Sequence, residues 1–528
     1  MHKNGLTLEE ALRILSLQEE VLSEKEKSLS EKDSKIKLLE EECDHLKEQL
    51  AKLLHKRYGK KSEKMPEEDY PVADEPKITE TEAKEIEAAE QEIKVSSHSR
   101  KKPKRKPLPA DFKRDILIHD LPLEKQICAY CQGSLHCIGE ETSEKLDYIP
   151  AQIKVIRQVR KKYGCRGCES GVSVAEGTPD FLPKSLAAPG LLAHVILSKY
   201  EDHCPLYRQE HIWQRLGVDI PRSTLCNWML LSAERLMVLM PLLKEEIIQG
   251  YYARADETPV QVLEENKVRT SKKAYMWVFT SGRPERAVIV YQFAMSRHGE
   301  TAEQFFKGFK GHLQTDGFSG YNKTAEQADI TQICCWAHGR RKFVAITKLA
   351  KQPGAAHYAV LVIAKLYKIE KEIKEKQLNF EQTKNYREKF AKPILEEFKV
   401  WLEDKKLKAP PKSPLGLAIS YILERWSPLT EYLKYGFLDI DNNFGERCIR
   451  PFTIGRKNWI FMGNERGGQA ASVFYSLIET AKSNQLNTYA YFRYLMTVLP
   501  TVDPNDQEVL RALLPNRITQ PELEVYLK

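Results

Sequence analysis

The chain has 528 residues, of which 42% are hydrophobic and 30% charged, and its formal net charge is +8. This length suits three or four domains of about 150 residues, and the composition excludes a wholly disordered or fibrous protein. No apolar run reaches the roughly 18 to 20 residues of a membrane span, and the first residues lack the pattern of a secretory leader. Eleven cysteines, four of them in CxxC pairs, predict metal binding in a reduced cytoplasm rather than disulfide bonds.

Residues 1–62 carry a heptad repeat. Apolar side chains recur every seven residues at Leu8, Leu15, Leu22, Leu29, Ile36, Cys43 and Leu50. The companion seam is apolar only in the second half, at Leu39, Leu46 and Leu53. The repeat predicts a coiled coil that joins protomers into a homo-oligomer, with weaker pairing in its first half. A single surface helix folded back on the body is the alternative.

Residues 63–107 separate into an acidic and a basic block. Residues 66–92 hold eleven acidic and two basic side chains, whereas residues 94–106 hold seven basic side chains and no acid. Blocks of like charge cannot share a packed core, so we predict a solvated tether that ends in a basic arm. Such an arm could follow the phosphate backbone of DNA, although a plain charged linker fits the same composition.

Residues 108–185 contain two CxxC pairs, Cys128 with Cys131 and Cys165 with Cys168. Two thiolates three positions apart can reach the same tetrahedral ion, so the four cysteines predict a zinc-ribbon-like module with structural Zn²⁺. Redox chemistry is the alternative, but it would not need a second pair. Between the pairs, apolar and basic residues alternate over 153–163, which predicts a half-buried strand.

The helical pattern of residues 186–249 contains a helix-turn-helix signature between 205 and 229. Gly217 suits a left-handed turn, Ile220 is expected to pack inside, and Ser223 is expected to cap the second helix. That helix would present four side chains to the major groove of DNA: Arg222, Ser223, Thr224 and Asn227. A purely structural pair of helices is the alternative.

Residues 250–345 alternate strands and helices in an order that predicts a mixed α/β domain. We expect a helix at 300–309 and strands at 251–263, 274–281, 287–293, 312–316 and 330–336. Residues 346–435 are almost wholly helical in pattern and predict an all-α insertion, with a proline-rich break at 409–414. The α/β domain would continue over 436–485, and residues 486–528 would form a C-terminal helical segment.

Three carboxylates are placed for metal-dependent phosphodiester chemistry. Asp256 lies on the first of these strands, and Asp316 follows a later strand where a glycine permits a turn. Glu446 would begin a helix that Asn442 caps. Mg²⁺ prefers hard oxygen ligands, and two ions about 3.5 to 4 Å apart can clamp both reacting oxygens. Taken singly, each acid fits a surface group or a helix cap equally well.

Ordered strings throughout the chain resemble the insertion-sequence-66 family of DDE transposases. They are RYGKKSEK at 57–64, the CxxC pairs, ADETPV at 255–260, TDGFSGY at 315–321, CWAHGRRKF at 335–343, DNNFGERCIRP at 441–451, GRKNWIFMG at 455–463 and SLIETAKSN at 476–484. The resemblance implies an RNase H-like core in which Asp256, Asp316 and Glu446 bind two Mg²⁺ or Mn²⁺ ions. The first knuckle departs from the usual pattern, because Ala129 stands where such families often have proline.

The resemblance also implies the function: a bacterial cytoplasmic, nucleoid-associated transposase that binds the ends of a mobile element and catalyses strand cleavage and strand transfer. Target DNA and small accessory proteins of the same element would be its other partners. A catalytically inactive DNA-binding protein and a nuclease without strand transfer are the alternatives. Glu257, Asp439 and Asp441 lie beside the proposed ligands, so the choice of Asp256 and Glu446 depends on the family pattern.

Basic side chains near the three acids are candidates for contacting DNA, because guanidinium groups match phosphate oxygens. They are His338, Arg340, Arg341, Arg447, Arg450, Arg456 and Lys457. For the first three, a cap at the exit of a strand and surface salt bridges are the alternative.

Overall fold

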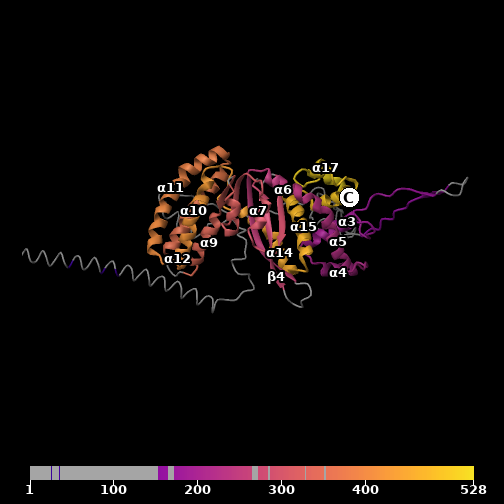
Figure 1. Cartoon of the computed structure of the whole chain (residues 1–528), viewed down its shortest axis with the longest axis horizontal. Coiled ribbons are helices and arrows are strands. Elements are labelled where there is room, and N and C mark those ends of the chain that lie inside the picture. Colours follow the sequence, from indigo (N-terminus) through magenta and orange to yellow (C-terminus); the bar gives the residue numbers. More distant parts are fainter. Residues whose placement is uncertain are drawn as a thin grey trace, which may run out of the picture. The chain divides into compact units, whose positions relative to one another are not determined.

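The computed structural model describes residues 25, 32, 35, 153–164, 172–263, 271–282, 286–327, 329–349 and 353–527 (Figure 1). Within this range, residues 153–177 belong to one compact unit and residues 178–527 to another. The heptad positions, the charged linker and the four CxxC cysteines lie outside the described residues. Lys25, Lys32 and Lys35 are described, and all three are helical and exposed.

The first unit contains a short antiparallel hairpin of β1 (Lys162–Gly164) and β2 (Val172–Val174). The half-buried strand expected over 153–163 is wrong, because residues 153–161 have no regular structure. Their apolar side chains are exposed, with Val155 at 93% and Val159 at 76%. Alternation of apolar and polar residues predicts a half-buried strand only where a second layer of structure covers the apolar face. The described part of this unit provides no such layer.

A six-stranded mixed sheet lies at the centre of residues 178–527, with the order β5-β4-β3-β6-β7 and β8 beside β3. Strands β3 to β5 are antiparallel, whereas β6, β7 and β8 add parallel pairings. The strands are β3 (Tyr252–Leu263), β4 (Ser271–Ser281), β5 (Ile289–Ala294), β6 (Gly311–Thr315), β7 (Ile330–Cys334) and β8 (Phe461–Met462). The first five lie close to the segments predicted from the sequence.

Helix α15 (Glu465–Ser483) covers the outer edge of the sheet at β5. The Ser476 hydroxyl accepts a hydrogen bond from the backbone N–H of Tyr291 (2.8 Å), and Thr480 accepts one from Ile289 (3.0 Å). These hydroxyls satisfy edge groups that would otherwise be open to pairing with another chain. Helix α14 (Asn443–Trp459) packs against β3 and β4, so two helices from the last third of the chain are fixed to the sheet.

Five helices between β7 and α14 build a second apolar cluster (Figure 1). They are α9 (Trp336–Thr347), α10 (Ala355–Glu375), α11 (Phe380–Lys408), α12 (Pro414–Glu424) and α13 (Trp426–Thr430), followed by η5 (Glu431–Leu433). Gly339 lets α9 approach α12, because an added Cβ would lie 2.4 Å from the Ile422 side chain. A buried ion pair between Arg387 and Glu370 (2.6 Å) links α11 to α10.

Helices α3 (Pro189–Tyr200), α4 (Leu206–Arg215) and α5 (Arg222–Leu236) precede the sheet, and η3 (Met237–Leu239) and α6 (Met240–Ile248) lead into it. The stretch Arg222–Ile248 is long and apolar enough to cross a membrane by length and composition, although the sequence analysis found no such run. Its side chains at Trp228, Leu236 and Leu243 lie in the main apolar cluster. That burial is typical of a core helix.

The remaining elements are short. Helix α7 (Glu300–Phe305) connects β5 to β6, and η4 (Ser319–Tyr321) with α8 (Asn322–Ala325) connects β6 to β7. The C-terminal elements are α16 (Thr488–Val498), η6 (Leu499–Thr501), α17 (Gln507–Ala512), α18 (Gln520–Leu523) and η7 (Glu524–Leu527). Helix α16 packs on α3, so a helix near the C-terminal end contacts one of those that precede the sheet. Helices outnumber strands throughout, so the fold is mixed α/β with a helical majority.

Candidate active site

Asp256 and Asp316 occupy corresponding positions on two neighbouring parallel strands. The last paired residues of β3 and β6 are Arg254 and Gln314. Each aspartate lies two residues further along its strand, so both side chains emerge on the same side of the sheet. Asp316 directly follows the end of β6, whereas β3 continues past Asp256 to pair with β4. The two carboxylates are therefore brought together at the carboxyl end of β6.

The turn after Asp316 is fixed by the backbone and by the helices that follow β7. Gly317 has a φ of +82°, a left-handed conformation that glycine adopts without strain. The Asp316 carboxylate accepts a hydrogen bond from the backbone N–H of Phe318 (2.7 Å). From α12, the Tyr421 hydroxyl donates to the carbonyl of Asp316 (2.6 Å), and Arg425 donates to the carbonyl of Gly317 (3.2 Å). The second aspartate is thus held from two directions.

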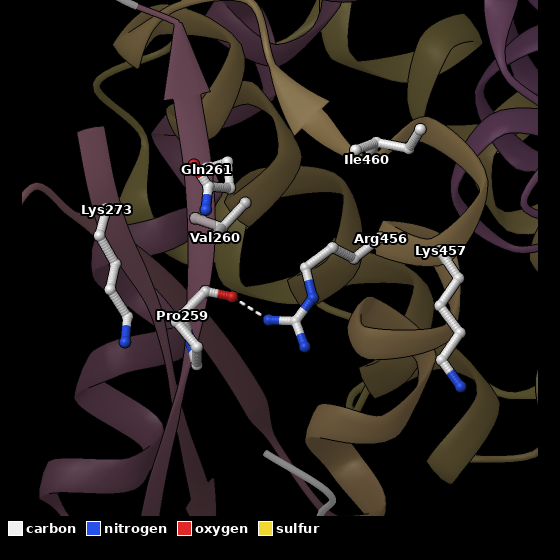
Figure 2. Close-up of a pocket in the computed structure, with 7 residues that line it drawn as sticks. All are labelled: Pro259, Val260, Gln261, Lys273, Arg456, Lys457 and Ile460. Atoms are coloured by element: carbon white, nitrogen blue, oxygen red, sulfur yellow. Dashed lines mark hydrogen bonds between the residues drawn. The ribbon is translucent and has the colours of Figure 1, made fainter. Parts of the chain in front are cut away.

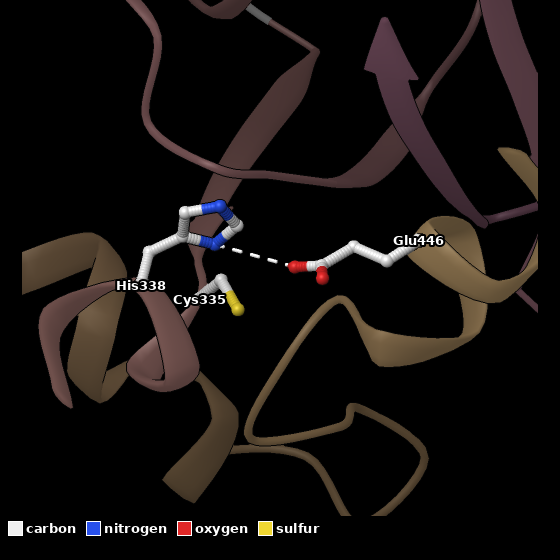
Figure 3. A group of neighbouring side chains, drawn as sticks. All are labelled: Cys335, His338 and Glu446. Atoms are coloured by element: carbon white, nitrogen blue, oxygen red, sulfur yellow. Dashed lines mark ion pairs between the residues drawn. The ribbon is translucent and has the colours of Figure 1, made fainter. Parts of the chain in front are cut away.

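Glu446 lies in the first turn of α14, with its side chain only 1% exposed. Its Oε1 lies 3.4 Å from Nδ1 of His338 (Figure 3). Its Oε2 lies 3.8 Å from a guanidinium nitrogen of Arg341. His338 and Arg341 are both on α9, which starts one residue after the Cys335 that follows β7. Helix α9 therefore turns Glu446 toward the carboxyl ends of β6 and β7.

The expected cap at Asn442 is wrong. This residue occupies the N-cap position of α14, but its side chain makes no capping hydrogen bond. It donates instead to the carbonyl of Ala255 (3.1 Å), directly before Asp256. The side chain of Asp441, not that of Asn442, accepts a hydrogen bond from the backbone N–H of Asn443 at the start of α14 (3.1 Å). The start of α14 is consequently tied to β3 next to the first aspartate.

The site is electrostatically strained without a cation. Burial raises the pKa of Asp256 well above its ordinary value, and the charges of Glu257 and Asp316 add to the shift, whereas Arg341 opposes it. Burial lowers the pKa of His338 to about 4, although the charge of Asp316 acts in the other direction. His338 is therefore neutral at physiological pH. Acids crowded in this way are what a bound cation would relieve.

Glu257, the neighbour of Asp256, is engaged elsewhere. Its side chain is 1% exposed and accepts two hydrogen bonds from the guanidinium of Arg297 (2.6 and 2.9 Å) and one from the hydroxyl of Tyr321 (2.6 Å). The guanidinium of Arg297 also stacks 3.8 Å from the ring centre of Phe318, inside the turn that follows Asp316. Glu257 thus connects β3 to the turn after Asp316, and burial together with the charge of Asp316 raises the pKa of Glu257.

Asp439 and Asp441, the neighbours of Glu446, also have protein partners. Asp439 forms an ion pair with Arg254, whose side chain is 2% exposed. Asp441 accepts hydrogen bonds from the backbone and side chain of Asn443, and its burial raises its pKa to about 6. The alternative ligands named from the sequence are therefore all committed to the scaffold.

The basic residues predicted on α14 divide into two sets. Arg447, Arg450 and Lys457 are exposed at spacings that place them on one side of the helix. Arg456 is 8% exposed and donates to Thr258 (3.1 Å) and to the carbonyl of Pro259 on β3. This engagement favours a structural role for Arg456. Arg340 and Arg341 on α9 are half-buried.

A cavity of about 390 Å³ is lined by residues of β3, β4 and α14 (Figure 2). It is lined by Pro259, Val260, Gln261, Lys273, Arg456, Lys457 and Ile460. The charged groups in this lining are all basic, so an anionic ligand such as a DNA phosphate is the chemistry that it fits.

The predicted helix-turn-helix corresponds to α4 and α5. Gly217 in the turn has a φ of +81°, and Trp213, Ile220 and Leu225 are buried. The expected cap at Ser223 is wrong, because α5 begins at Arg222 and Ser223 lies inside its first turn. Glu210 of α4 instead accepts the backbone N–H of Arg222 (2.8 Å). Arg222, Ser223 and Asn227 are exposed, and Thr224 is half-buried.

The family model described as Transposase IS66 family matches residues 184–470, which include the sheet, all three acids and the intervening helices. The chain belongs to the IS66 transposase family. Further models match the zinc-finger binding domain of transposase IS66 at 125–169, Transposase C of IS166 homeodomain at 45–116, and the IS66 C-terminal element at 476–515. The zinc-finger match contains all four CxxC cysteines, and the match over 45–116 overlaps the end of the heptad repeat.

Relatives from Sinorhizobium fredii (strain NBRC 101917 / NGR234) resemble the chain over most of its length. Uncharacterized protein y4jD is 35% identical over 388 residues, 71% of this chain and 75% of that protein. Uncharacterized protein y4qI is 32% identical over 429 residues, 78% of each chain. Membership in the IS66 family supports a transposase role with DNA binding, whereas the relatives' names state no chemistry.

Several residues of this IS66 site were missed in the sequence. They are Arg297, Tyr321, Cys335, Tyr421 and Arg425. The partners of Arg297 and Tyr421 lie 40 and 105 residues away, so local spacing gives no signal for them. Cys335 stands in the quoted string CWAHGRRKF, and its thiol lies within 4.8 Å of ligand atoms of His338 and Glu446. Its burial, with the charges of Glu446 and Asp441, raises its pKa well above the ordinary value.

Proposed function

We propose that the chain is an active DDE transposase that binds the ends of its mobile element and catalyses Mg²⁺-dependent strand cleavage and strand transfer. The observation that carries the proposal is the shared position of the two aspartates, with Glu446 turned toward them by His338 and Arg341. Asp256, Asp316 and Glu446 are the catalytic acids in this proposal.

The sheet supports an RNase H-like core. An antiparallel set, β3 to β5, is followed by β6 and β7, which run parallel to β3. After the five helices, the chain returns to the same sheet, where β8 pairs with β3. This return supports a core formed by residues 250–345 and 436–485 with an all-α insertion at 346–435. Residues 486–528 then form a C-terminal helical segment.

The acids fit a hard divalent cation. They offer carboxylate oxygens, the ligands that Mg²⁺ and Mn²⁺ prefer. Burial, followed by the charges of Glu257 and Asp316, raises the pKa of Asp256. The neighbouring acids Glu257, Asp439 and Asp441 have protein partners in Arg297, Arg254 and Asn443. The choice of Asp256 and Glu446 as metal ligands follows the family pattern. We infer two Mg²⁺ or Mn²⁺ ions per site, by analogy with two-metal phosphoryl transfer.

The chain's own residues position these acids for in-line attack on a phosphodiester. Asp256 and Asp316 are fixed by the sheet and by the Tyr421 contact, and Glu446 by α9. When bound there, Mg²⁺ would activate the attacking water, and later the 3′-hydroxyl of the element, and would stabilise the leaving oxygen. Arg341 adds positive charge where the phosphate would lie.

The other parts of the chain supply DNA binding and assembly in this proposal. Residues 186–249 would recognise element ends through the exposed face of α5. Residues 108–185 would also recognise them, as a module whose fold is stabilised by a structural Zn²⁺ bound to Cys128, Cys131, Cys165 and Cys168. The basic arm within residues 63–107 and the exposed side chains Arg447, Arg450 and Lys457 would follow phosphates. His338 and Arg340 stay in the proposed set of DNA contacts, whereas Arg456 would act from the scaffold.

The coiled coil of residues 1–62 would join protomers so that two element ends are held in one complex. The protein would work at the nucleoid in the bacterial cytoplasm, together with small accessory proteins of the same element.

Replacing either aspartate tests the proposal. Asp256→Asn and Asp316→Asn should each lower Mg²⁺-dependent cleavage of an element end by at least about 1,000-fold, because the metal loses a charged ligand. Binding of the same DNA should persist. The matched control is Asp329→Asn, an exposed acid paired with Lys310, which should cleave normally. Cleavage by both active-site variants at the wild-type rate would refute the assignment.

Two further assays separate the alternatives. Supplying a pre-cleaved end with a free 3′-hydroxyl should give strand transfer into target DNA. Hydrolysis without transfer would instead indicate a nuclease. Calorimetry can compare Mn²⁺ binding by the wild type and by Asp256→Asn. Equally weak binding by both would indicate an inactive DNA-binding protein.

A further inference from the structure

Three different metal-binding groups meet beside the catalytic acids. A ligand atom from each of Cys335, His338 and Glu446 lies within 4.8 Å of the other two (Figure 3). They come from three places: the residue after β7, the first turn of α9 and the first turn of α14. Sulfur, imidazole nitrogen and carboxylate oxygen together form the ligand set of a borderline-soft cation, whereas Mg²⁺ binds to oxygen alone.

Two backbone N–H groups point at the sulfur of Cys335. The backbone N–H of Asn442 donates to Sγ of Cys335 (3.2 Å), and the backbone N–H of His338 also points to it. Such donors stabilise negative charge on sulfur. Nδ1 of His338 is buried and makes no hydrogen bond within the described residues, although it lies 3.4 Å from Glu446. A cation placed between the three groups would give this nitrogen a partner.

We propose that Cys335, His338 and Glu446 form a site for a thiophilic divalent cation of the Zn²⁺ class. Three protein ligands would leave one position of a tetrahedral ion to water. Binding would form a bond from the metal to Sγ of Cys335 and would release the thiol proton to solvent.

Glu446 belongs both to this Zn²⁺ site and to the Mg²⁺ site of the proposed function. The inhibition described next therefore rests on the proposed function. A Zn²⁺ ion held by Cys335 and His338 would draw the Glu446 carboxylate away from Asp256 and Asp316. Zn²⁺ at this site therefore inhibits Mg²⁺-dependent cleavage by removing one of its ligands. The four CxxC cysteines would bind their own Zn²⁺ independently.

Co²⁺ is the probe for the binding step, since a cobalt–thiolate bond absorbs in the near ultraviolet. The full chain is first given one equivalent of Zn²⁺ to fill the CxxC site, and Co²⁺ is then titrated. Wild type should show the thiolate band at one further equivalent, and Cys335→Ser should lose it. Cys334→Ser, the adjacent buried cysteine outside the cluster, should keep it and is the matched control. An equal band in wild type and Cys335→Ser would overturn the site, and so would no band in either.

His338→Gln covers the case in which Cys335→Ser does not fold, as judged by circular dichroism, because the His338 side chain is 21% exposed and easier to replace. It should weaken Co²⁺ binding at least roughly tenfold. Unchanged binding would overturn the assignment of His338.

The inhibition step is measured separately, as the Zn²⁺ concentration that halves Mg²⁺-dependent cleavage. This concentration should be at least about tenfold higher for Cys335→Ser than for wild type or Cys334→Ser. Equal sensitivity would show that the two sites do not compete for Glu446. A failure of the proposed function would instead appear as absent cleavage in wild type with the cobalt band intact.

Discussion

Asp256, one of the three proposed catalytic acids, carries a charge that its buried position disfavours. Burial and two neighbouring acids raise its pKa well above the ordinary value, so ionisation is harder in the folded than in the unfolded chain. Above the raised pKa, the carboxylate therefore lowers folding stability. Below the unfolded value both states are protonated and the effect disappears. Active sites commonly exchange stability for function in this way.

Asp256→Asn should accordingly stabilise the metal-free protein. With a chelator present, we expect a melting temperature about 2 °C higher than that of wild type at pH 8. The difference should shrink as pH falls and vanish near pH 4. The melting temperatures are measured by thermal unfolding between pH 4 and pH 8, with Asp329→Asn as the control. Destabilisation at pH 8, or a difference that does not change with pH, would contradict the assigned environment.

The pair of Arg297 and Glu257 should behave as one unit. Arg297→Ala leaves a buried carboxylate without its charged partner and should reduce the free energy of unfolding by about 2 kcal/mol. Adding Glu257→Gln removes the charge as well, so the double variant should recover much of that loss. Urea unfolding of the two single variants and the double variant completes the cycle. Strictly additive losses would show that the two side chains act independently.

At the scale of elements, the helices between β7 and α14 hold the turn that follows Asp316. Tyr421→Phe removes the hydrogen bond to the Asp316 carbonyl and should lower cleavage roughly fivefold, with about 1 kcal/mol less stability. Tyr386→Phe is the control, because its hydroxyl bonds to Glu372 within the same group of helices. Its stability loss should be similar and its cleavage rate unchanged. Equal rates for the two variants would exclude the proposed anchor.

The exposed side of α14 should contribute to DNA affinity without sequence preference. Arg450→Ala should lower the slope of the logarithm of affinity against the logarithm of salt concentration by about 1. Lys384→Ala, an exposed lysine on α11, is the control and should leave the slope unchanged. Binding titrations at several salt concentrations give both slopes. A normal slope for Arg450→Ala would place the DNA elsewhere.

Residue patterns within a single element predicted strands correctly where the packing of the folded protein agreed with them. The strands from β3 to β7 lie close to the segments predicted from strand-like, β-branched and aromatic residues. The alternation of apolar and basic residues failed as a prediction over 153–161, where the side chains are exposed. The caps expected at Ser223 and Asn442 failed because Glu210 and Asp441 supply the hydrogen bonds. Sequence spacing does not contain such contacts between elements.

In the second unit as a whole, neighbours of the proposed catalytic acids belong to two apolar clusters. The larger cluster includes Ala255 beside Asp256 and Ile449 of α14, and the smaller one includes Cys334 at the end of β7 and Trp336 of α9. The family strings named the acids, but no local pattern predicts their proposed convergence across 60 and 130 residues of chain. The register of β3 with β6 and the contact of α9 with α14 support that convergence.

Anomalous scattering from Mn²⁺ in crystals of the full chain tests this convergence most directly. Manganese peaks should lie among the carboxylates of Asp256, Asp316 and Glu446, and they should disappear in Asp256→Asn. Peaks bound by other acids, or a manganese-soaked structure in which one of the three carboxylates remains remote from the ions, would contradict the account.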